Sequence, residues 1–235
     1  MRGFDSLLHL LLINQCPSGG MVYTHDLKSC AERHVGSSPT SGTMTIFYTR
    51  KGDSGSSIIG KKKIKKTNPF TETLGELDEL NSMIGVLKAD RISLRLEKIL
   101  HQVQEDLFII QANVAYVMLK EKRKPPVFLP AKIVWSEQII DTIENKLKSP
   151  KGFVISGSTR NSAWLDMLRA RSRKVERSVL KIVSLREISR REKNWELKID
   201  GNIVPYLNRL SSLFFALARD ESHRAGKKEQ HPKYK

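Results

Sequence analysis

Apolar residues recur three and four positions apart through most of the chain after residue 69. Such spacing places them on one face of an α-helix, so the repeat predicts helices that bury one side. We expect five helices, over residues 69–88, 93–120, 131–148, 161–183 and 202–223. Pro69 suits the first turn of the first helix, because proline at that position loses no hydrogen bond. Long amphipathic helices with short connections favour an all-α, up-and-down bundle of five helices.

Extended structure is expected at only two places. Residues 45–49 form a short N-terminal segment with strand character, and residues 153–155, Phe-Val-Ile, follow the stop signal of the third helix. The last residues, 226–235, are basic and carry no apolar repeat. We expect them to form a disordered basic tail, since chain termini are ordered only where something ties them down.

The first 43 residues differ from the rest of the chain. Residues 17–43 are dominated by Gly, Ser, Thr and Pro, without an apolar period that could form a core. A short apolar run at residues 7–13 is far below the roughly 20 residues that span a bilayer, although it leaves a leader peptide open. Residues 18–43 resemble a translated transfer-RNA gene. We therefore expect residues 1–43 to be a disordered or spurious extension, with translation beginning at Met44 and the domain spanning residues 44–225.

Positive charge is the main compositional feature. The chain has 41 Lys and Arg against 25 Asp and Glu, a formal charge of +16. Residues 1–43 are balanced, so the whole excess belongs to the part that follows. This charge predicts an anionic partner, which could be nucleic acid, anionic lipid or a polyphosphate. Both cysteines lie before Met44, so the remaining chain needs no oxidising compartment and we expect it in the cytoplasm.

A loop rich in Gly and Ser carries the first candidate site. Two glycines between residues 49 and 57 allow the backbone N–H groups to form a nest for phosphate oxygens. Further donors in the loop are Thr49, Arg50, Lys51, Ser56 and Ser57. The spacing is not that of a Walker loop, and an ordinary Gly-Ser turn is the alternative. A lysine run at residues 61–66 follows, which is typical of a solvated surface or a nucleic-acid patch.

Polar residues also occupy particular helix faces. Arg169, Arg173 and Glu176 recur at the spacing of one face, with a surface charge ladder between Arg173 and Glu176 as the alternative. Asp78 lies between apolar positions of the first helix, which makes it a candidate functional residue. The alternative is that its side chain simply faces solvent. Asn208 lies inside the apolar pattern of the last helix and needs a partner, either another helix or a ligand. No histidine pair has metal-ligand spacing, so we assign no protein metal site.

Four motifs together resemble one family. Residues 48–55 with Lys66, and residues 72–81 (ETLGELDELN), are similar to the N-terminal signature of PduO-type ATP:cob(I)alamin adenosyltransferases. Residues 169–177 (RARSRKVER) resemble the Arg-rich helix of that family, and residues 206–211 (YLNRLS) resemble its C-terminal signature. The resemblance covers about residues 44–219, with the motifs in the family's order and spacing.

The resemblance implies a fold, a reaction and an assembly. It implies a five-helix bundle that forms a homotrimer with active sites between subunits. In the implied reaction cob(I)alamin attacks the 5′-carbon of ATP, giving adenosylcobalamin and a triphosphate that leaves with Mg²⁺. A flavin reductase would supply the reduced corrinoid, and an adenosylcobalamin-dependent enzyme would use the product. The nucleophile is a metal already reduced elsewhere, so no general base is needed. Neither a membrane nor a nucleic acid is implied.

The resemblance also implies roles for individual residues. Those expected to bind ATP are Thr49, Arg50, Lys51, Gly52, Ser56, Ser57, Lys66, Arg173, Lys174, Glu176, Arg177 and Asn208. Those expected at the cobalamin site are Phe153, Asp78 and Arg169, and these three with Arg173 form the catalytic set. Asp78 and Arg169 match a salt bridge across the subunit interface. Phe153 matches an aromatic residue that packs at the lower face of the corrin ring and drives off the lower axial ligand.

Three departures from the family pattern bear on activity. Residues 156–158 are Ser-Gly-Ser where the family usually has Pro-Gly-Gly, Lys174 replaces an arginine, and Ser212 replaces an aspartate. A lysine loses the bidentate geometry that an arginine offers to phosphate. Two other functions therefore stay open: a catalytically weak carrier or sensor that binds adenosylcobalamin, and a basic helical nucleic-acid-binding protein, which the charge alone supports.

Overall fold

A computed structural model describes residues 50, 52–59, 62–119, 124–147, 152–188 and 198–234. The backbone divides into two compact units, Met1–Ile64 and Lys65–Lys235. Residues 1–43 and the short extended segment predicted at residues 45–49 lie outside the described residues.

A small hairpin follows the predicted phosphate loop. Strands β1 (Ser56–Ile59) and β2 (Lys62–Lys65) pair in a two-stranded sheet. This corrects the sequence-based prediction, which placed Ser56 and Ser57 in the loop and left the lysine run without structure. The reason is local: β-branched isoleucines in both strands favour extended backbone, and Ile59 is buried while the lysines stay mostly exposed.

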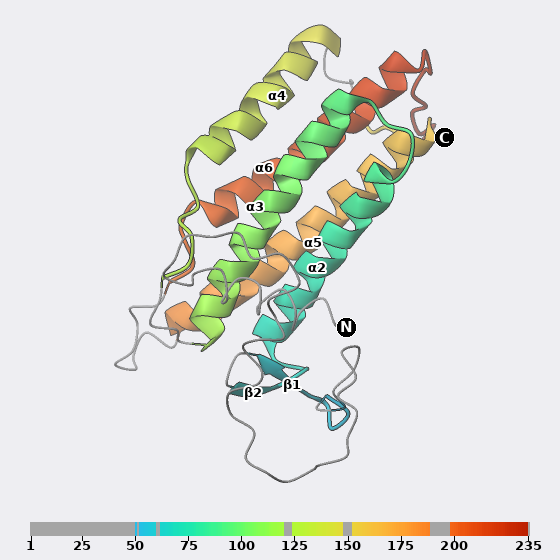
Figure 1. Ribbon diagram of the computed structural model, residues 1–235. Coiled ribbons are helices and arrows are strands. Elements are labelled where there is room, and N and C mark those ends of the chain that lie inside the picture. The colour runs from blue at the N-terminus through green and yellow to red at the C-terminus, as the bar shows by residue number, and fades with distance from the viewer. Residues whose placement is uncertain are drawn as a thin grey trace, which may run out of the picture. The chain divides into compact units, whose positions relative to one another are not determined.

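The second unit is the predicted helical bundle. Its helices are α2 (Pro69–Lys88), α3 (Leu94–Leu119), α4 (Ala131–Leu147), α5 (Arg160–Ile188) and α6 (Ile203–Arg224). Successive helices run in opposite directions, as the colour gradient of Figure 1 shows. The predicted bounds are confirmed to within one residue, except that α5 continues five residues beyond position 183.

Polar caps explain where two of these helices begin. Asn68 precedes α2, and its side-chain oxygen accepts a hydrogen bond from the Phe70 N–H at 3.0 Å. Before α5, Thr159 and Ser162 cap each other: each hydroxyl accepts a hydrogen bond from the other residue's backbone N–H, at 3.1 and 2.9 Å. Such caps satisfy N–H groups that have no partner inside the helix.

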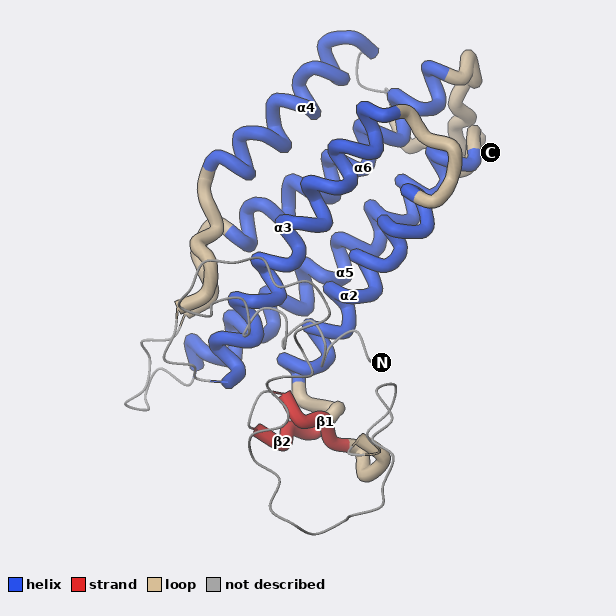
Figure 2. The backbone as a smooth tube through the Cα atoms, viewed as in Figure 1, coloured by secondary structure: helices blue, strands red, loops and turns tan. Residues whose placement is uncertain are grey.

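The apolar stripes predicted from the sequence form the core. Helix α5 packs against α6 and α2, α6 packs against α4, and α2 packs against α3 (Figure 2). Fully buried residues of the α2 stripe are Leu74, Leu77, Leu80, Ile84 and Leu87. Each side chain of this size contributes about 1.5–3 kcal/mol when it leaves water, so the stripes hold the bundle together.

A buried polar network joins α3, α4 and α6. Asp106 is completely buried and accepts hydrogen bonds from the Tyr206 hydroxyl at 2.8 Å and from Gln102 at 2.9 Å. Lys132 donates to the same carboxylate. Burial raises the pKa of the Tyr206 phenol, and the neighbouring Asp106 charge and hydrogen bond raise it further. The phenol therefore stays protonated and acts as a donor.

The chain after α6 folds back onto the bundle. The Ile155 N–H donates to the Gln230 carbonyl at 2.8 Å, which forms an isolated antiparallel bridge. The short extended piece expected at residues 153–155 thus pairs with the C-terminal residues, more order than we expected of a segment predicted to be a disordered tail. Among the described helices, none has the length and apolar content to cross a bilayer.

Candidate active site

Two residues predicted to contact ATP meet where α5 packs against α6. The Asn208 side-chain amide donates to the Glu176 carboxylate at 3.0 Å. Arg209 donates to the Asn208 amide oxygen at 2.9 Å and, through Nε, to Glu137 on α4 at 2.7 Å. Asn208 therefore has the partner that its place in the apolar pattern required. Arg209 and Glu137 were missed, because spacing within one helix does not show which residues of a neighbouring helix lie opposite.

Acidic residues of α2 neutralise part of the Arg-rich helix. Lys174 forms an ion pair with the buried carboxylate of Glu76 at 3.0 Å, and Arg171 pairs with Glu79. Lys174 was predicted to bind ATP, and the structure places its ammonium group against α2. The signal that sequence reasoning overlooked was Glu76 itself, an acidic residue inside the apolar stripe of its helix.

Two cations of the same helix remain available to an anion. Arg173 and Arg177 are exposed, and neither forms an ion pair with any residue that the structure describes. In particular, Glu176 bonds to Asn208 and not to Arg173, so the charge-ladder alternative is wrong for this face. Two unpaired guanidinium groups next to the Glu176–Asn208 pair make a surface that can receive a polyanion.

Asp78 and Arg169 lack a charged partner within the described part of the chain. Asp78 on α2 is half-buried, and burial raises the pKa of its carboxyl group. The Nε atom of Arg169 is buried without a hydrogen bond, and its guanidinium lies 6.0 Å from the centre of the Phe215 ring. Burying charged groups without partners is unfavourable, so both side chains are suited to a charged partner that the described residues do not supply.

Phe153 lies in the connection between α4 and α5. It is 78% exposed, more than Ile155 two residues later. The Ser-Gly-Ser stretch that follows includes Gly157, whose φ of 105° suits glycine. Ser158 of the same stretch contacts the Ser222 hydroxyl on α6. The departure from the family pattern thus supplies a hydroxyl that fixes this connection to the bundle.

The N-terminal loop is described within its own unit. Thr49 and Lys51 lie outside the described residues. The Asp53 N–H donates to the Arg50 carbonyl and the Gly55 N–H to the Gly52 carbonyl, both at 3.2 Å, and Gly55 has a φ of 74°. These successive turns fit the ordinary Gly-Ser turn given as the alternative, and phosphate binding by this loop stays a prediction. In the second unit, Lys66 is half-buried just after β2.

The described residues offer no protein metal site. No group of three or more His, Cys, Asp or Glu side chains among them is placed to hold a metal ion.

Comparison with known proteins assigns the family. A family model described as cobalamin adenosyltransferase matches residues 47–221. The chain belongs to the cobalamin adenosyltransferase family. It is 32% identical over 182 residues to a corrinoid adenosyltransferase of Citrobacter freundii, a match that covers 76% of this chain and 96% of the relative. The corrinoid adenosyltransferase PduO of the same organism is 26% identical, and the chain spans only about half (50%) of its length.

Solved structures support the same assignment. One variant of the PduO-type ATP:corrinoid adenosyltransferase of Lactobacillus reuteri, complexed with cobalamin and ATP, matches with a TM-score of 0.68 and 28% identity. The match covers 78% of this chain and 94% of that structure. Another variant, with the same ligands, gives a TM-score of 0.70 at 27% identity, covering 80% and 99%. The predicted family and fold are therefore confirmed.

Proposed function

We propose that this member of the cobalamin adenosyltransferase family transfers the 5′-deoxyadenosyl group of ATP to the cobalt of cob(I)alamin, with triphosphate as the other product. The observation that carries the proposal is the Glu176–Asn208 hydrogen bond beside Arg173. These residues come from two separate motifs, and the fold brings them to one surface. The relatives whose names describe corrinoid adenosyltransferases support the same reaction.

The charge of the leaving triphosphate explains why the proposed site contains positively charged side chains. Triphosphate gains negative charge as the bond to the 5′-carbon breaks, and preorganised positive groups stabilise that charge in the transition state. Arg173 and Arg177 on α5 would do this, together with Lys66. In its own unit, the 50–55 loop offers backbone donors suited to phosphate oxygens. Mg²⁺ would be held mainly by phosphate oxygens, which suits an ion that retains several waters and needs few protein ligands.

The three residues predicted at the cobalamin site, Phe153, Asp78 and Arg169, would position the corrinoid. Phe153 would pack against the lower face of the corrin ring and keep a ligand from the cobalt there. We propose a homotrimer in which Asp78 of one subunit pairs with Arg169 of its neighbour, so that active sites form between subunits. Among the described residues neither half-buried charge has a charged partner, which supports this arrangement.

The reaction requires a source of cob(I)alamin and an enzyme that uses adenosylcobalamin. A one-electron reductant, for which a flavin reductase is the candidate, would deliver cob(I)alamin, and an adenosylcobalamin-dependent enzyme would consume the product. We propose that this takes place in the cytoplasm.

One assay separates this function from the alternatives. Purified protein is mixed with ATP, Mg²⁺ and chemically reduced cobalamin, and the absorbance of cob(I)alamin is followed. We expect its loss to depend on both ATP and protein. Tight corrinoid binding without turnover would instead select the carrier or sensor. Salt-sensitive binding of duplex or single-stranded DNA, without loss of cob(I)alamin, would select a nucleic-acid-binding protein.

A further inference from the structure

The main chain around Phe153 is held although the ring is not. The side chain is 78% exposed, so packing of the ring cannot explain its position. The Phe153 carbonyl accepts a hydrogen bond from Nδ1 of His231 at 2.8 Å, and the Ile155 N–H donates to the Gln230 carbonyl at 2.8 Å. Both partners come from the end of the chain, about 75 residues further along the sequence. We call residues 226–234 the C-terminal strap.

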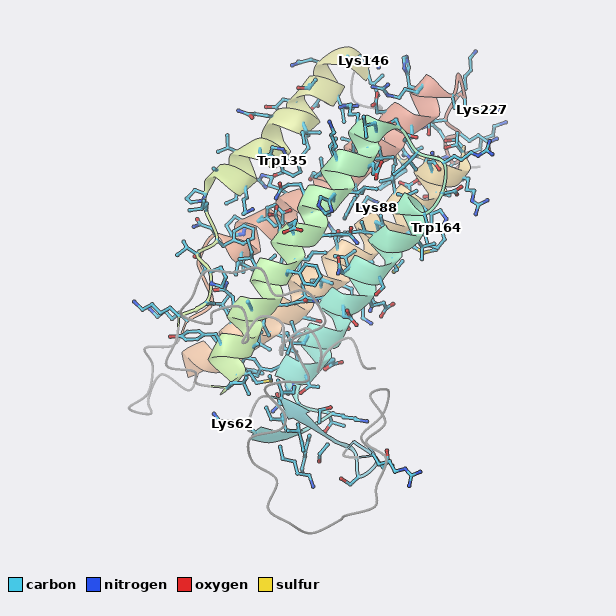
Figure 3. The ribbon with its side chains drawn as sticks, in the orientation of Figure 1. Lys62, Lys88, Trp135, Lys146, Trp164 and Lys227 are labelled. Atoms are coloured by element: carbon cyan, nitrogen blue, oxygen red, sulfur yellow. The ribbon has the colours of Figure 1, made fainter. Side chains whose placement is uncertain are left out.

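The strap begins with a specific chain reversal. Gly226 follows α6 with a φ of 64°, a left-handed conformation that glycine adopts without strain. Its N–H donates to the His223 carbonyl at 2.9 Å, and the Lys227 N–H donates to the Ser222 carbonyl at 3.0 Å. These two bonds form a Schellman motif, which ends a helix and turns the chain back. Figure 3 shows Lys227 at the same end of the bundle as Lys146, which lies in the last turn of α4.

A buried ion-pair cluster anchors the strap to the bundle. Glu229 of the strap pairs with Arg219 of α6, which is 6% exposed. Arg219 also donates to Asp166 of α5 at 2.8 Å. The Arg219 guanidinium lies 4.8 Å from the centre of the Phe215 ring, and Arg169 lies 6.0 Å from the same ring. The strap therefore contacts Arg219, which shares the Phe215 ring with Arg169, a residue proposed for the corrinoid site.

The other end of the Phe153 connection is held as well. The Ser158 hydroxyl contacts Ser222 of α6 and lies 3.1 Å from the Ser162 hydroxyl of α5. The connection is thus fixed at residues 153, 155 and 158. Between these points lies Gly157, which has a positive φ. Glycine restricts the backbone less than other residues do, so the local sequence alone would leave this stretch mobile.

We propose that the C-terminal strap is a positioning element for Phe153, with His231 and Gln230 as its contacts. Holding the main chain in advance removes the cost of ordering the loop when a ligand binds, and it keeps an apolar ring in water where it would otherwise fold against the bundle. In the proposed reaction the strap presents Phe153 to the corrin ring. The inference deepens the proposed function and rests on it for the identity of that ligand.

The first test measures the strap directly in the full-length protein. His231→Ala removes the ring donor, and His231→Asn retains a donor close to the position of Nδ1. Lys233→Ala changes an exposed strap residue that forms no hydrogen bond or ion pair among the described residues. We expect amide hydrogen exchange at Ile155 to accelerate by about tenfold or more in His231→Ala, and to stay near the wild-type rate in the other two variants. An unchanged rate at Ile155 in His231→Ala would show that the strap does not hold the connection.

The second test asks whether the strap acts through Phe153. Turnover is measured from cob(I)alamin and, separately, from cob(II)alamin with a reductant. Loss of the lower-face contact hinders reduction more than adenosyl transfer, so His231→Ala should lower the second rate several-fold more than the first. His231→Asn should restore the ratio. Equal losses in both assays, despite faster exchange at Ile155, would overturn the positioning role. If the wild-type protein turned over neither substrate, the proposed reaction would fail, whereas the exchange measurement would still decide whether the strap holds the connection.

Discussion

Asn208 on α6 and Glu176 on α5 are joined by a hydrogen bond of 3.0 Å between the side-chain amide and the carboxylate. The two residues lie 32 positions apart in the sequence and come from different motifs. Arg209 holds the oxygen end of the same amide, which fixes its orientation. A nucleotide that binds beside this pair would therefore contact hydrogen-bond donors and acceptors whose orientation is already fixed.

Removing the Asn208 amide should weaken the binding of ATP more than it weakens the fold. Asn208→Ala loses the hydrogen bonds to Glu176 and from Arg209, but Arg209 keeps Glu137 and the position is exposed. We expect KM for ATP to rise about tenfold, which corresponds to roughly 1.4 kcal/mol and to one hydrogen bond to a charged group. Steady-state kinetics check this, with Gln138→Ala on the exposed side of α4 as the control. An unchanged KM would remove Asn208 from the proposed site.

Arg173 should matter for turnover through its charge on the leaving triphosphate. Arg173→Ala removes an exposed guanidinium that forms no ion pair among the described residues, so the fold should survive. We expect turnover from cob(I)alamin to fall about 10- to 100-fold, the range for losing a charged hydrogen bond in a transition state. Lys181→Ala, which removes one positive charge further along the same helix, should have little effect. Equal losses in the two variants would mean that the summed positive charge of α5 matters, and not a specific contact of Arg173.

Phe153→Ala should affect reduction-coupled activity more than adenosyl transfer. The ring is 78% exposed, so its removal leaves the core intact and stability should change little. We expect a larger loss of rate from cob(II)alamin with a reductant than from cob(I)alamin, because only the first assay needs the lower ligand removed. Val127→Ala, another exposed apolar residue at 67%, serves as the control. The same loss in both assays would contradict the lower-face role.

The hydroxyl of Tyr206 should contribute measurably to stability. Tyr206→Phe keeps the ring in the core but leaves one oxygen of the buried Asp106 without its donor. A buried polar group without a partner costs about 1–3 kcal/mol, so the free energy of unfolding in urea should fall by that amount. Tyr116→Phe on α3 changes a hydroxyl for which the described residues provide no hydrogen bond, and it should be nearly neutral. Equal effects of the two changes would show that the network adds nothing.

Asp220 should make the bundle sensitive to acid. Burial opposes ionisation of its carboxyl group, but hydrogen bonds from Arg224, Arg95 and Lys146 outweigh it and lower the pKa below the ordinary 3.8. The unfolded chain therefore takes up a proton first, so stability from these contacts is present above pH 3.8 and is lost as the pH falls through the lowered value.

Asp220→Asn tests this pH dependence. The substitution leaves three cations without their shared anion, so we expect lower stability at neutral pH and a flatter loss of stability toward acid. Thermal unfolding across that pH range measures both effects, with the exposed Asp141→Asn as the matched control. A wild-type slope retained in Asp220→Asn would assign the acid sensitivity to other groups.

Most of the fold could be predicted from the sequence because helices are determined by local spacing. A residue that repeats every three or four positions lies on one face wherever the helix is placed, so the stripe containing Leu77 and Leu80 defined α2 without knowledge of its neighbours. The hairpin was missed for the opposite reason. Each of its strands has four residues, too few for a clear period, and pairing rather than spacing stabilises them.

The site was predictable only in part. The resemblance named Glu176, Arg173 and Asn208, and two of these are bonded to each other in the fold. It also named Lys174, whose ammonium group the fold directs to Glu76 of another helix. A charged residue's partner depends on which helices pack together, and the sequence of one helix does not contain that information.

The sequence by itself determined the five helices, most of their ends and the family, since periodicity, the position of Pro69 and collinear motifs are all properties of short stretches of chain. Only the tertiary structure decided which charges are neutralised, which stay free for a polyanion, and what holds Phe153. The contact between His231 and the Phe153 carbonyl spans 78 residues. It depends on the reversal at Gly226, which brings the end of the chain back to the bundle. Such long-range contacts follow from the packing of α5 against α6 together with this reversal, because only the folded chain brings these distant groups within hydrogen-bonding distance.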